Sequence, residues 1–373
     1  MRVLFSRLWQ LPWSMVLAVA ILSLIGALAL YSASQGSWSP WAERHIVRAA
    51  VGALMMFSIV LIPIRLIHQS AYLVYVGALI ILLALQVIGF GQGSTRWIAL
   101  GPLNFQPSEP AKLAVILVLS RYFSDRTPEQ LRSFIYYIPA FVMVALPFAL
   151  VLVQPDLGTS LMILAGGLLV IFAAGMPYRY IFLLLAAFIG SLPVLWANLY
   201  DYQKQRILTF FNPGDDLLGA GFQITQSKIA LGSGGIFGKG FLMGSQSQLN
   251  YLPEKQTDFV FTMIGEEFGI IGNLFVLAVY FIIFLSILRL SWRIQHRFGR
   301  MVCIGISGML FLYVFVNIAM VTGLLPVVGV PLPLISYGGT AMLTVFIALG
   351  LVNAMAVNGD LEDEDLSLKL SRH

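Results

Sequence analysis

A carboxylate at position 258 stands where a long polar loop meets a long apolar segment. Asp258 closes the stretch NYLPEKQTD (250–258), and the apolar segment begins with the next residue. An ionisable side chain beside hydrocarbon is energetically costly, so a functional role is the first hypothesis for such a residue. If Asp258 faces a cavity at the membrane surface, we expect an enzyme that acts on a lipid-borne substrate.

Two further charges, Glu109 and Lys112, lie in the segment FQPSEPAKL (105–113). Pro110 fits only the first turn of a helix and Ser108 is a good N-cap candidate, which places both charges in the opening turns. At a spacing of three residues, the two side chains project from one helix face and can pair. One interpretation is a buried ion pair that fixes helix positions. The other is that Lys112, held by Glu109, contacts an anionic headgroup.

Asp156 occupies a tight turn in the segment QPDLG (154–158). An Asp that directly follows Pro is an ordinary turn residue, which is the simplest interpretation. The alternative is that Asp156 shares a cavity with Glu109, Lys112 and Asp258, because the charge pattern described below places all four at the same face of the membrane.

The glycine-rich segment GSGGIFGKG (232–240) has only a superficial likeness to a nucleotide-binding loop. A P-loop needs glycine where Ser233 stands and a hydroxyl residue where Gly240 stands, and the dinucleotide fingerprint fails as well. We interpret the segment as mobile backbone whose glycines allow close approach to a ligand. Lys228 and Lys239 are then candidates to meet a phosphate group.

The other titratable residues give weaker signals. Glu266 and Glu267 follow Asp258 on the same apolar segment, but at about 100° per residue the three cannot all face one cavity. We leave both out of the catalytic set and expect one of them to pair with another helix or a partner protein. The histidines show no metal-ligand spacing; they are His45, His68, His296 and His373.

The composition defines the class of protein. The chain is 59% hydrophobic and 10% charged, with a mean hydropathy of +0.87, whereas soluble domains have about 25% charged residues. Cys303 is the single cysteine, which excludes an intrachain disulfide and a cysteine metal cluster. The net charge of +5 reflects arginines placed by the bilayer and does not indicate a nucleic-acid partner.

Recurring apolar runs of about 20 residues, the length that crosses a bilayer, predict an all-α polytopic membrane protein. We expect about ten transmembrane helices in one domain that covers residues 1–373. The first run is longer than the roughly 7–15 apolar residues of a signal peptide, so we expect it to be a transmembrane helix. The expected spans are 13–33, 46–63, 71–91, 108–123, 134–153, 157–175, 180–199, 259–288, 301–323 and 338–357.

The distribution of basic residues orients these spans in a cytoplasmic membrane. With the N-terminus inside, short inner segments hold 13 Lys and Arg residues and short outer segments hold 3. This bias puts both termini in the cytoplasm and Asp258 on the outer face. A second outer loop, 92–107, is rich in glycine and carries Arg96.

The long extracytoplasmic loop of about 200–258 lies between helices 7 and 8. Its length indicates a function, because most connections have only about 4–6 residues. Apolar spacing at 222–231 predicts a short interfacial helix within it. At the other end of the chain, the acidic cytoplasmic tail 358–373 is expected to be solvated.

Eight segments of this chain resemble the SEDS family (shape, elongation, division and sporulation). The resemblance covers essentially the whole chain and agrees with the ten expected spans. The segments are RWI (96–98), FQPSEPAK (105–112), QPDLGT (154–159), QRI (205–207), QSKIA (226–230), GSGGIFGKG (232–240), PEKQTDF (253–259) and LISYGGT (334–340).

The resemblance implies a peptidoglycan glycosyltransferase that polymerises lipid II at the outer face of the cytoplasmic membrane. It also implies partners: a class B penicillin-binding protein, which crosslinks the glycan, and other membrane proteins of the elongation complex. Two small departures from the family pattern, Gln256 and Thr262, leave the carboxylate untouched. The short N-terminus and the segment LPEK (252–255) favour the elongation branch of the family over the division branch.

The implied reaction joins a sugar hydroxyl to an anomeric carbon whose leaving group is a lipid diphosphate. We expect Asp258 to be the general base that deprotonates the 4-hydroxyl of the acceptor, with inversion to a β-1,4 product. Lys112 and Arg206 are the first candidates to stabilise the diphosphate, with Arg96 behind them. A divalent cation, Mg²⁺ or Mn²⁺, is a further candidate, although the sequence shows no all-protein metal cage.

Two other classes of function fit parts of the pattern. A flippase that moves lipid II across the bilayer would also have many spans and buried charges. Against it, the candidate charges gather at one face, whereas a transporter needs gates on both sides. A scaffold without catalysis would use the long outer loop as a docking surface.

Overall fold

The computed structural model describes residues 10–88, 96–100, 103–198, 201–212, 219–249, 251–252 and 254–370. Ten long helices occupy the positions of the ten expected spans, and the prediction of an all-α polytopic membrane protein is confirmed. They are α2 (Trp13–Ala33), α3 (Trp41–Ile59), α4 (Ile64–Ile88), α5 (Ser108–Ser124), α6 (Ile138–Val153), α7 (Leu157–Ala173), α8 (Tyr178–Asn198), α12 (Val260–Arg293), α13 (Arg297–Val321) and α14 (Gly339–Leu370).

The ten helices differ in how strongly apolar they are. Six are long and apolar enough to cross a membrane, namely α2, α4, α6, α12, α13 and α14, while α7 and most of α8 are shorter apolar helices. Helix α5 is buried along nearly its whole length and packs against α4, α7 and α13. Because α5 touches protein rather than lipid, it tolerates the charges of Glu109 and Lys112 that a lipid-facing helix would exclude.

The outer loop between α8 and α12 contains three helices: α9 (Asp201–Phe211), α10 (Ala220–Gly234) and α11 (Ser245–Gln248). Helix α10 confirms the helix expected at 222–231. The loop 92–107 departs from a purely helical fold, since β1 (Ile98–Leu100) and β2 (Leu103–Phe105) form an antiparallel hairpin. Two short 3-10 turns, Gln130–Arg132 and Phe134–Tyr136, precede α6.

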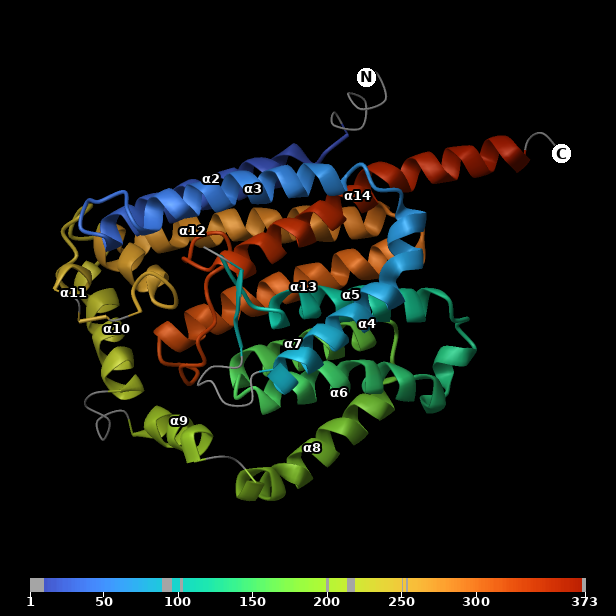
Figure 1. Cartoon of the computed structure of the whole chain (residues 1–373), viewed down its shortest axis with the longest axis horizontal. Helices are drawn as coiled ribbons and strands as arrows, with labels where there is room; N and C mark the ends of the chain where they lie inside the picture. The colour runs from blue at the N-terminus through green and yellow to red at the C-terminus, as the bar shows by residue number, and fades with distance from the viewer. Residues whose placement is uncertain are drawn as a thin grey trace.

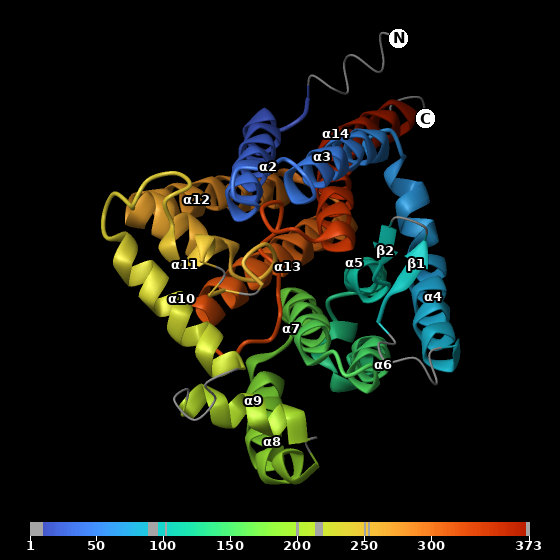
Figure 2. The ribbon, with the colours of Figure 1, turned by 60° about the vertical axis from the view of Figure 1, so that its left-hand side comes forward.

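The helices form one elongated bundle with distinct ends (Figure 1). The start of α2 and the end of α14 lie at one end of the bundle, and α10 and α11 lie at the other. Helix α8 stands at the edge of the molecule in both views (Figures 1 and 2), and most of its large apolar side chains are exposed. This arrangement gathers the outer-loop helices at the end opposite the chain termini.

Helix α12 breaks at Gly269, which has a φ of 67°. The glycine-rich segment 232–240 packs directly onto this break. The carbonyl oxygens of Gly235 and Ile236 accept hydrogen bonds from the backbone N–H groups of Ile270 and Ile271 (3.0 and 3.2 Å). A Cβ at Gly238 would lie 2.1 Å from the carbonyl oxygen of Glu267. The interpretation of this segment as mobile backbone beside a ligand is therefore wrong: its glycines allow close approach to α12.

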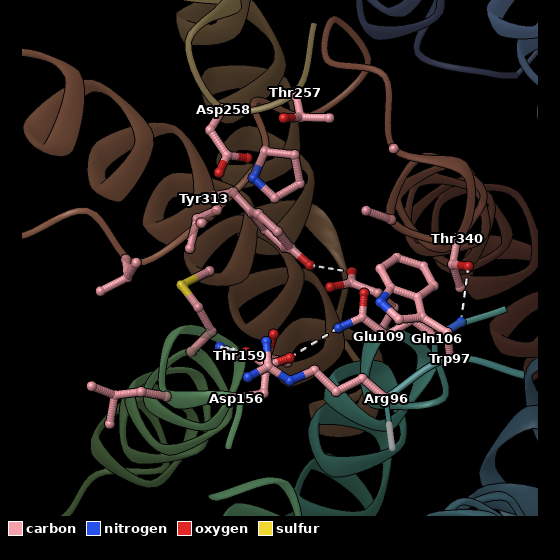
Figure 3. A pocket seen from close by; sticks show the side chains of 18 of the residues that line it. Arg96, Trp97, Gln106, Glu109, Asp156, Thr159, Thr257, Asp258, Tyr313 and Thr340 are labelled. Atoms are coloured by element: carbon pink, nitrogen blue, oxygen red, sulfur yellow. Dashed lines mark hydrogen bonds between the residues drawn. The ribbon is translucent and has the colours of Figure 1, made fainter. Parts of the chain in front are cut away.

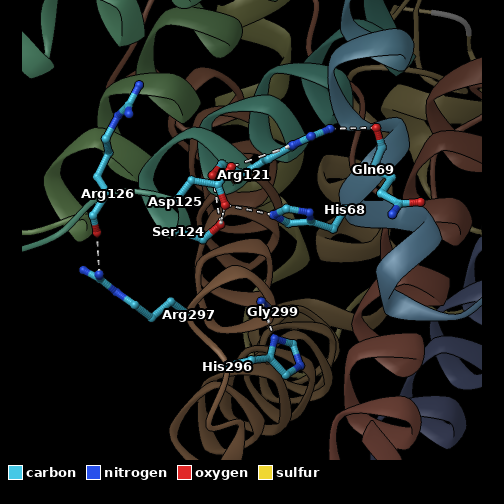
Figure 4. Close-up of polar contacts among 9 residues, drawn as sticks. All are labelled: His68, Gln69, Arg121, Ser124, Asp125, Arg126, His296, Arg297 and Gly299. Atoms are coloured by element: carbon cyan, nitrogen blue, oxygen red, sulfur yellow. Dashed lines mark hydrogen bonds and ion pairs between the residues drawn. The ribbon is translucent and has the colours of Figure 1, made fainter.

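Polar contacts hold the opposite end of the bundle together (Figure 4). Asp125, directly after α5, accepts a hydrogen bond from His68 of α4 (3.2 Å), and Arg121 of α5 donates to the carbonyl oxygen of Gln69 (2.6 Å). His296 caps the N-terminus of α13 by accepting from the backbone N–H of Gly299 (2.9 Å). These histidines therefore have structural contacts between and within helices.

Candidate active site

A cavity of about 260 Å³ lies near the outer-loop end of the bundle. Its walls come from α5, α7, α9 and α13, from the residues that flank the β1–β2 hairpin, and from the start of α14 and the loops that precede α12 and α14. Figure 3 shows part of this lining. Six of the eight predicted site residues line it together: Arg96, Glu109, Lys112, Asp156, Arg206 and Asp258. Residues from distant parts of the sequence therefore meet at one surface.

Asp258 is half-buried in the cavity wall, directly before α12. Its backbone is held in place, because its carbonyl oxygen accepts a hydrogen bond from Asn317 Nδ2 of α13 (2.9 Å). The preceding residue, Thr257, has its carbonyl oxygen bound by Ser336 Oγ (2.5 Å). A Cβ at Gly329 would lie 3.4 Å from Asp258 Oδ2, so the loop before α14 approaches the carboxylate closely.

The surroundings of Asp258 raise the pKa of its carboxyl group to about 7. Burial is the largest cause, and the negative charge of Glu254 adds to it. A hydrogen bond from Thr257 and the positive charge of Arg206 oppose the rise. A carboxyl group with a pKa near neutrality can both accept and release a proton at working pH, which suits a general base.

Glu109, Lys112 and Tyr313 form a buried polar triad beside Asp258. Lys112 Nζ donates to Glu109 Oε1 (2.7 Å) and to the hydroxyl of Tyr313, which in turn donates to Glu109 Oε2 (2.5 Å). The predicted pairing of Glu109 with Lys112 is confirmed. Ser108, expected as an N-cap, is instead the first helical residue of α5, because the cap position falls on Pro107.

Asp156 serves two purposes at once. Its Oδ1 accepts from the backbone N–H of Thr159 (3.2 Å), which caps α7, and its Oδ2 accepts from Gln106 Nε2 (3.0 Å). It also lines the cavity, so the turn interpretation and the cavity interpretation both describe it. Arg96 holds the same turn by donating to the carbonyl oxygens of Gln154 (Nε, 2.9 Å) and Pro155.

The structure does not bring Lys228 and Lys239 into this cavity. Lys228 is exposed on α10, and Lys239 forms an ion pair with Glu266 (2.7 Å). Because Glu266 is fully buried at the base of the outer loop, it uses the lysine charge that we expected to meet phosphate. Glu267 accepts a hydrogen bond from Ser32 of α2. Neither glutamate lines the Asp258 cavity, in agreement with their omission from the catalytic set.

Sequence reasoning missed several residues of the site. Gln106 and Tyr337, which also line the cavity, lie inside segments that carry the family resemblance, yet neither was singled out. Tyr313 and Asn317 were missed because they are isolated polar residues in an apolar run. Their one detectable signal is the cost of burying a polar group without a partner. Among the described residues, no group of three or more His, Cys, Asp or Glu side chains is arranged to hold a metal ion.

Residues 10–360 match the family of cell cycle proteins that comprises FtsW, RodA and SpoVE. The chain therefore belongs to this SEDS family of polytopic membrane proteins, and the resemblance drawn from its motifs is confirmed.

Its relatives include the peptidoglycan glycosyltransferase MrdB of Escherichia coli K12, which is 44% identical over 342 residues, 91% of each chain. A probable peptidoglycan glycosyltransferase FtsW of Geobacter metallireducens is 36% identical over 91% of this chain and 92% of the relative. Stage V sporulation protein E of Bacillus subtilis is 34% identical over 91% of this chain and 94% of the relative.

Solved structures have the same fold. One chain of a peptidoglycan synthase complex that coordinates polymerization and crosslinking superposes with a TM-score of 0.78 at 31% identity, covering 93% of this chain and 97% of that one. The rod shape determining protein RodA of Thermus thermophilus superposes with a TM-score of 0.69 at 28% identity, covering 94% and 97%.

Proposed function

We propose that this chain is a peptidoglycan glycosyltransferase that polymerises lipid II into β-1,4-linked glycan strands. The observation that carries the proposal is the shared cavity, in which a carboxylate with a pKa near 7 faces the same space as Lys112, Arg96 and Arg206. A base beside cations is the arrangement that a sugar transfer from a diphosphate requires, because one group receives a proton while the others meet a departing anion.

In the proposed step, Asp258 takes the proton of the acceptor 4-hydroxyl. The hydroxyl oxygen forms a bond to the anomeric carbon of the donor, and the bond from that carbon to the diphosphate oxygen breaks. The electron pair leaves with undecaprenyl diphosphate, so an α-linked donor gives a β product in one inversion. Lys112 and Arg206 stabilise the diphosphate as its charge develops, and Arg96 is the next candidate for this role.

A divalent cation is a separate part of the proposal. Mg²⁺ is commonly held by one or two carboxylates together with substrate phosphates. Asp156 is the cavity carboxylate that fits such a role, since Glu109 is paired with Lys112 and Asp258 is the proposed base. Chelation by EDTA, followed by restoration with Mg²⁺ or Mn²⁺, tests this requirement.

We place the activity at the outer face of the cytoplasmic membrane, with both termini in the cytoplasm. The positive-inside count supports this orientation. The outer-loop helices α10 and α11 lie at the end of the bundle opposite the termini (Figure 1). The identity to MrdB and the fit to RodA favour a role in cell elongation over division. The synthase complex, which couples polymerization to crosslinking, supports a class B penicillin-binding protein and other elongation proteins as partners.

The decisive experiment incubates the purified full chain with labelled lipid II and measures glycan length. We expect polymer from the unaltered protein and none from Asp258→Asn or Asp258→Ala, both of which should still insert into membranes. Normal polymer from either variant defeats the assignment of Asp258. If the protein reorients lipid II in vesicles without chain growth, the flippase alternative replaces the proposal. The absence of both activities would indicate a scaffold.

A further inference from the structure

A buried tyrosine, Tyr313, completes the polar triad at the wall of the Asp258 cavity. Its side chain is 1% exposed. Its hydroxyl donates to Glu109 (Figure 3) and accepts a hydrogen bond from Lys112. The Lys112 ammonium also lies over the tyrosine ring, 4.4 Å from its centroid. One side chain from α13 therefore touches the charged pair of α5 through both its hydroxyl and its ring.

The hydrogen bonds of the triad leave one N–H donor of Lys112 available for a ligand. An ammonium group has three N–H donors and no acceptor. Among the described residues, Glu109 Oε1 and the Tyr313 hydroxyl each accept one of these bonds. Since Lys112 lines the cavity, its third N–H is the donor available to a ligand there.

The hydroxyl of Tyr313 also fixes the carboxylate. It donates to Glu109 Oε2, the oxygen that Lys112 does not use. With both oxygens engaged by different donors, the carboxylate cannot rotate to take a second bond from the ammonium. Without this hydroxyl, Lys112 would lose an acceptor and Glu109 would be free to draw the ammonium away from the cavity.

We propose that Tyr313 is a positioning residue, whose hydroxyl orients the Lys112 ammonium toward the anionic leaving group of the substrate. The inference rests on the proposed function, because it gives Lys112 a diphosphate to meet. Tyr313 acts through Lys112 and takes no part in proton transfer. The alternative is that Tyr313 only satisfies a buried ion pair, in which case its loss would reduce folded protein but leave ligand contacts unchanged.

The test uses Tyr313→Phe, which keeps the ring and removes the hydroxyl. The matched control is Tyr137→Phe, because the Tyr137 hydroxyl is also buried but donates to the carbonyl oxygen of Leu131 (2.9 Å), away from the cavity. For each full-length protein, kcat and KM for lipid II are measured per folded molecule. The affinity for inorganic diphosphate is measured by calorimetry, which can also be applied to variants that have no polymerase activity.

We expect Tyr313→Phe to lower kcat and diphosphate affinity by a factor of about 10 to 100, the effect of losing a hydrogen bond to a charged group. KM should change less than kcat, because the charge on the leaving group increases in the transition state. Lys112→Gln should weaken diphosphate binding at least as much as Tyr313→Phe does, with Arg206 and Arg96 retaining measurable affinity, and adding Tyr313→Phe to it should cause no further loss. Tyr137→Phe should behave like the unaltered protein.

Unchanged kcat and diphosphate affinity in Tyr313→Phe overturn the inference, as does a further loss when it is added to Lys112→Gln. Full diphosphate binding by Lys112→Gln overturns it too, since Tyr313 would then have no cation to aim. Failure of the proposed function is recognised separately, because the unaltered protein would then form no polymer from lipid II.

Discussion

The side-chain amide of Asn317 donates one hydrogen bond to the carbonyl oxygen of Asp258 (2.9 Å) and another to that of Val330 (2.7 Å). Asn317 lies one helical turn beyond Tyr313 on α13. A single face of this helix therefore supports both Asp258, the proposed general base, and the Glu109–Lys112 pair. The distance between base and cation is set by α13, although neither group belongs to it.

Asn317→Leu should lower the rate of polymerisation by about 100-fold, because a small displacement of a reacting group has an effect of this order. The control is Asn358→Leu, since Asn358 likewise bridges two carbonyl oxygens, those of Val60 (3.1 Å) and Ile62 (3.0 Å), at a site that does not line the cavity. Glycan formation per folded molecule is the measurement. Equal losses in the two variants would show that the effect of Asn317→Leu does not depend on its contact with Asp258.

The pKa of Asp258, about 7, predicts the pH dependence of the reaction. Below this pH the carboxyl group is protonated and cannot accept the hydroxyl proton, so kcat/KM should rise as pH increases through about 7. Values of kcat/KM measured from pH 5 to pH 9, with lipid II as the substrate, test this ascending limb of the pH–rate profile. A rate independent of pH across that range would contradict the role of Asp258 as base.

Two neighbours should move this limb in opposite directions. Glu254 raises the pKa of Asp258, so Glu254→Gln should shift the limb to lower pH. Arg206 lowers that pKa, so Arg206→Gln should shift the limb to higher pH. Arg206→Gln should also reduce the maximal rate, because it removes a cation from the cavity, and the same pH series measures both effects. Shifts of the same sign would disprove the electrostatic explanation.

The buried Glu109–Lys112 pair should show a non-additive effect on stability. Removing one partner leaves an uncompensated buried charge, which costs about 3–5 kcal/mol. Lys112→Met and Glu109→Gln should therefore each lower the thermal unfolding temperature of the purified protein. The double variant should recover much of this loss, since both groups are then neutral, yet it should still form no glycan. An active double variant would mean that the pair is only structural.

Two glycines of α10 allow a matched test of how tightly the outer loop packs on α12. A Cβ at Gly234 would lie 2.0 Å from the carbonyl oxygen of Gly265, whereas a Cβ at Gly232 would meet nothing within 4 Å. Gly234→Ala should therefore lower the unfolding temperature. Gly232→Ala should raise stability by up to about 1 kcal/mol, because alanine favours helix. Equal stability of the two variants would show that α10 does not pack tightly on α12.

The helices could be predicted because each needs about 20 apolar residues to cross the bilayer, a pattern visible in one dimension. The grouping of Glu109, Lys112, Asp156 and Asp258 followed from their common membrane face. The pairing of Lys239 with Glu266 was not predicted, since nothing in a linear sequence shows that the two side chains are near each other. The two residues lie 27 positions apart and meet because the segment 232–240 packs beside the first part of α12, where Lys239 and Gly240 donate backbone hydrogen bonds to the carbonyl oxygens of Glu266 and Glu267.

Tyr313 and Asn317 escaped prediction for a related reason. A polar side chain in an apolar run signals that a partner exists, but the partner belongs to another helix. For Tyr313 the partner is on α5, 204 residues away, and for Asn317 it is the backbone of Asp258, 59 residues away. Such contacts depend on how the helices cross, which the local pattern does not encode.

The size of the cavity, about 260 Å³, falls slightly below the roughly 300–1,000 Å³ of pockets that enclose whole drug-sized ligands. Only the reacting ends of the donor and the acceptor can be surrounded by protein at one time. The remainder of a lengthening strand must extend into the space beyond the membrane. Product length is therefore not limited by this compartment, and the same chamber can serve the first addition and the hundredth.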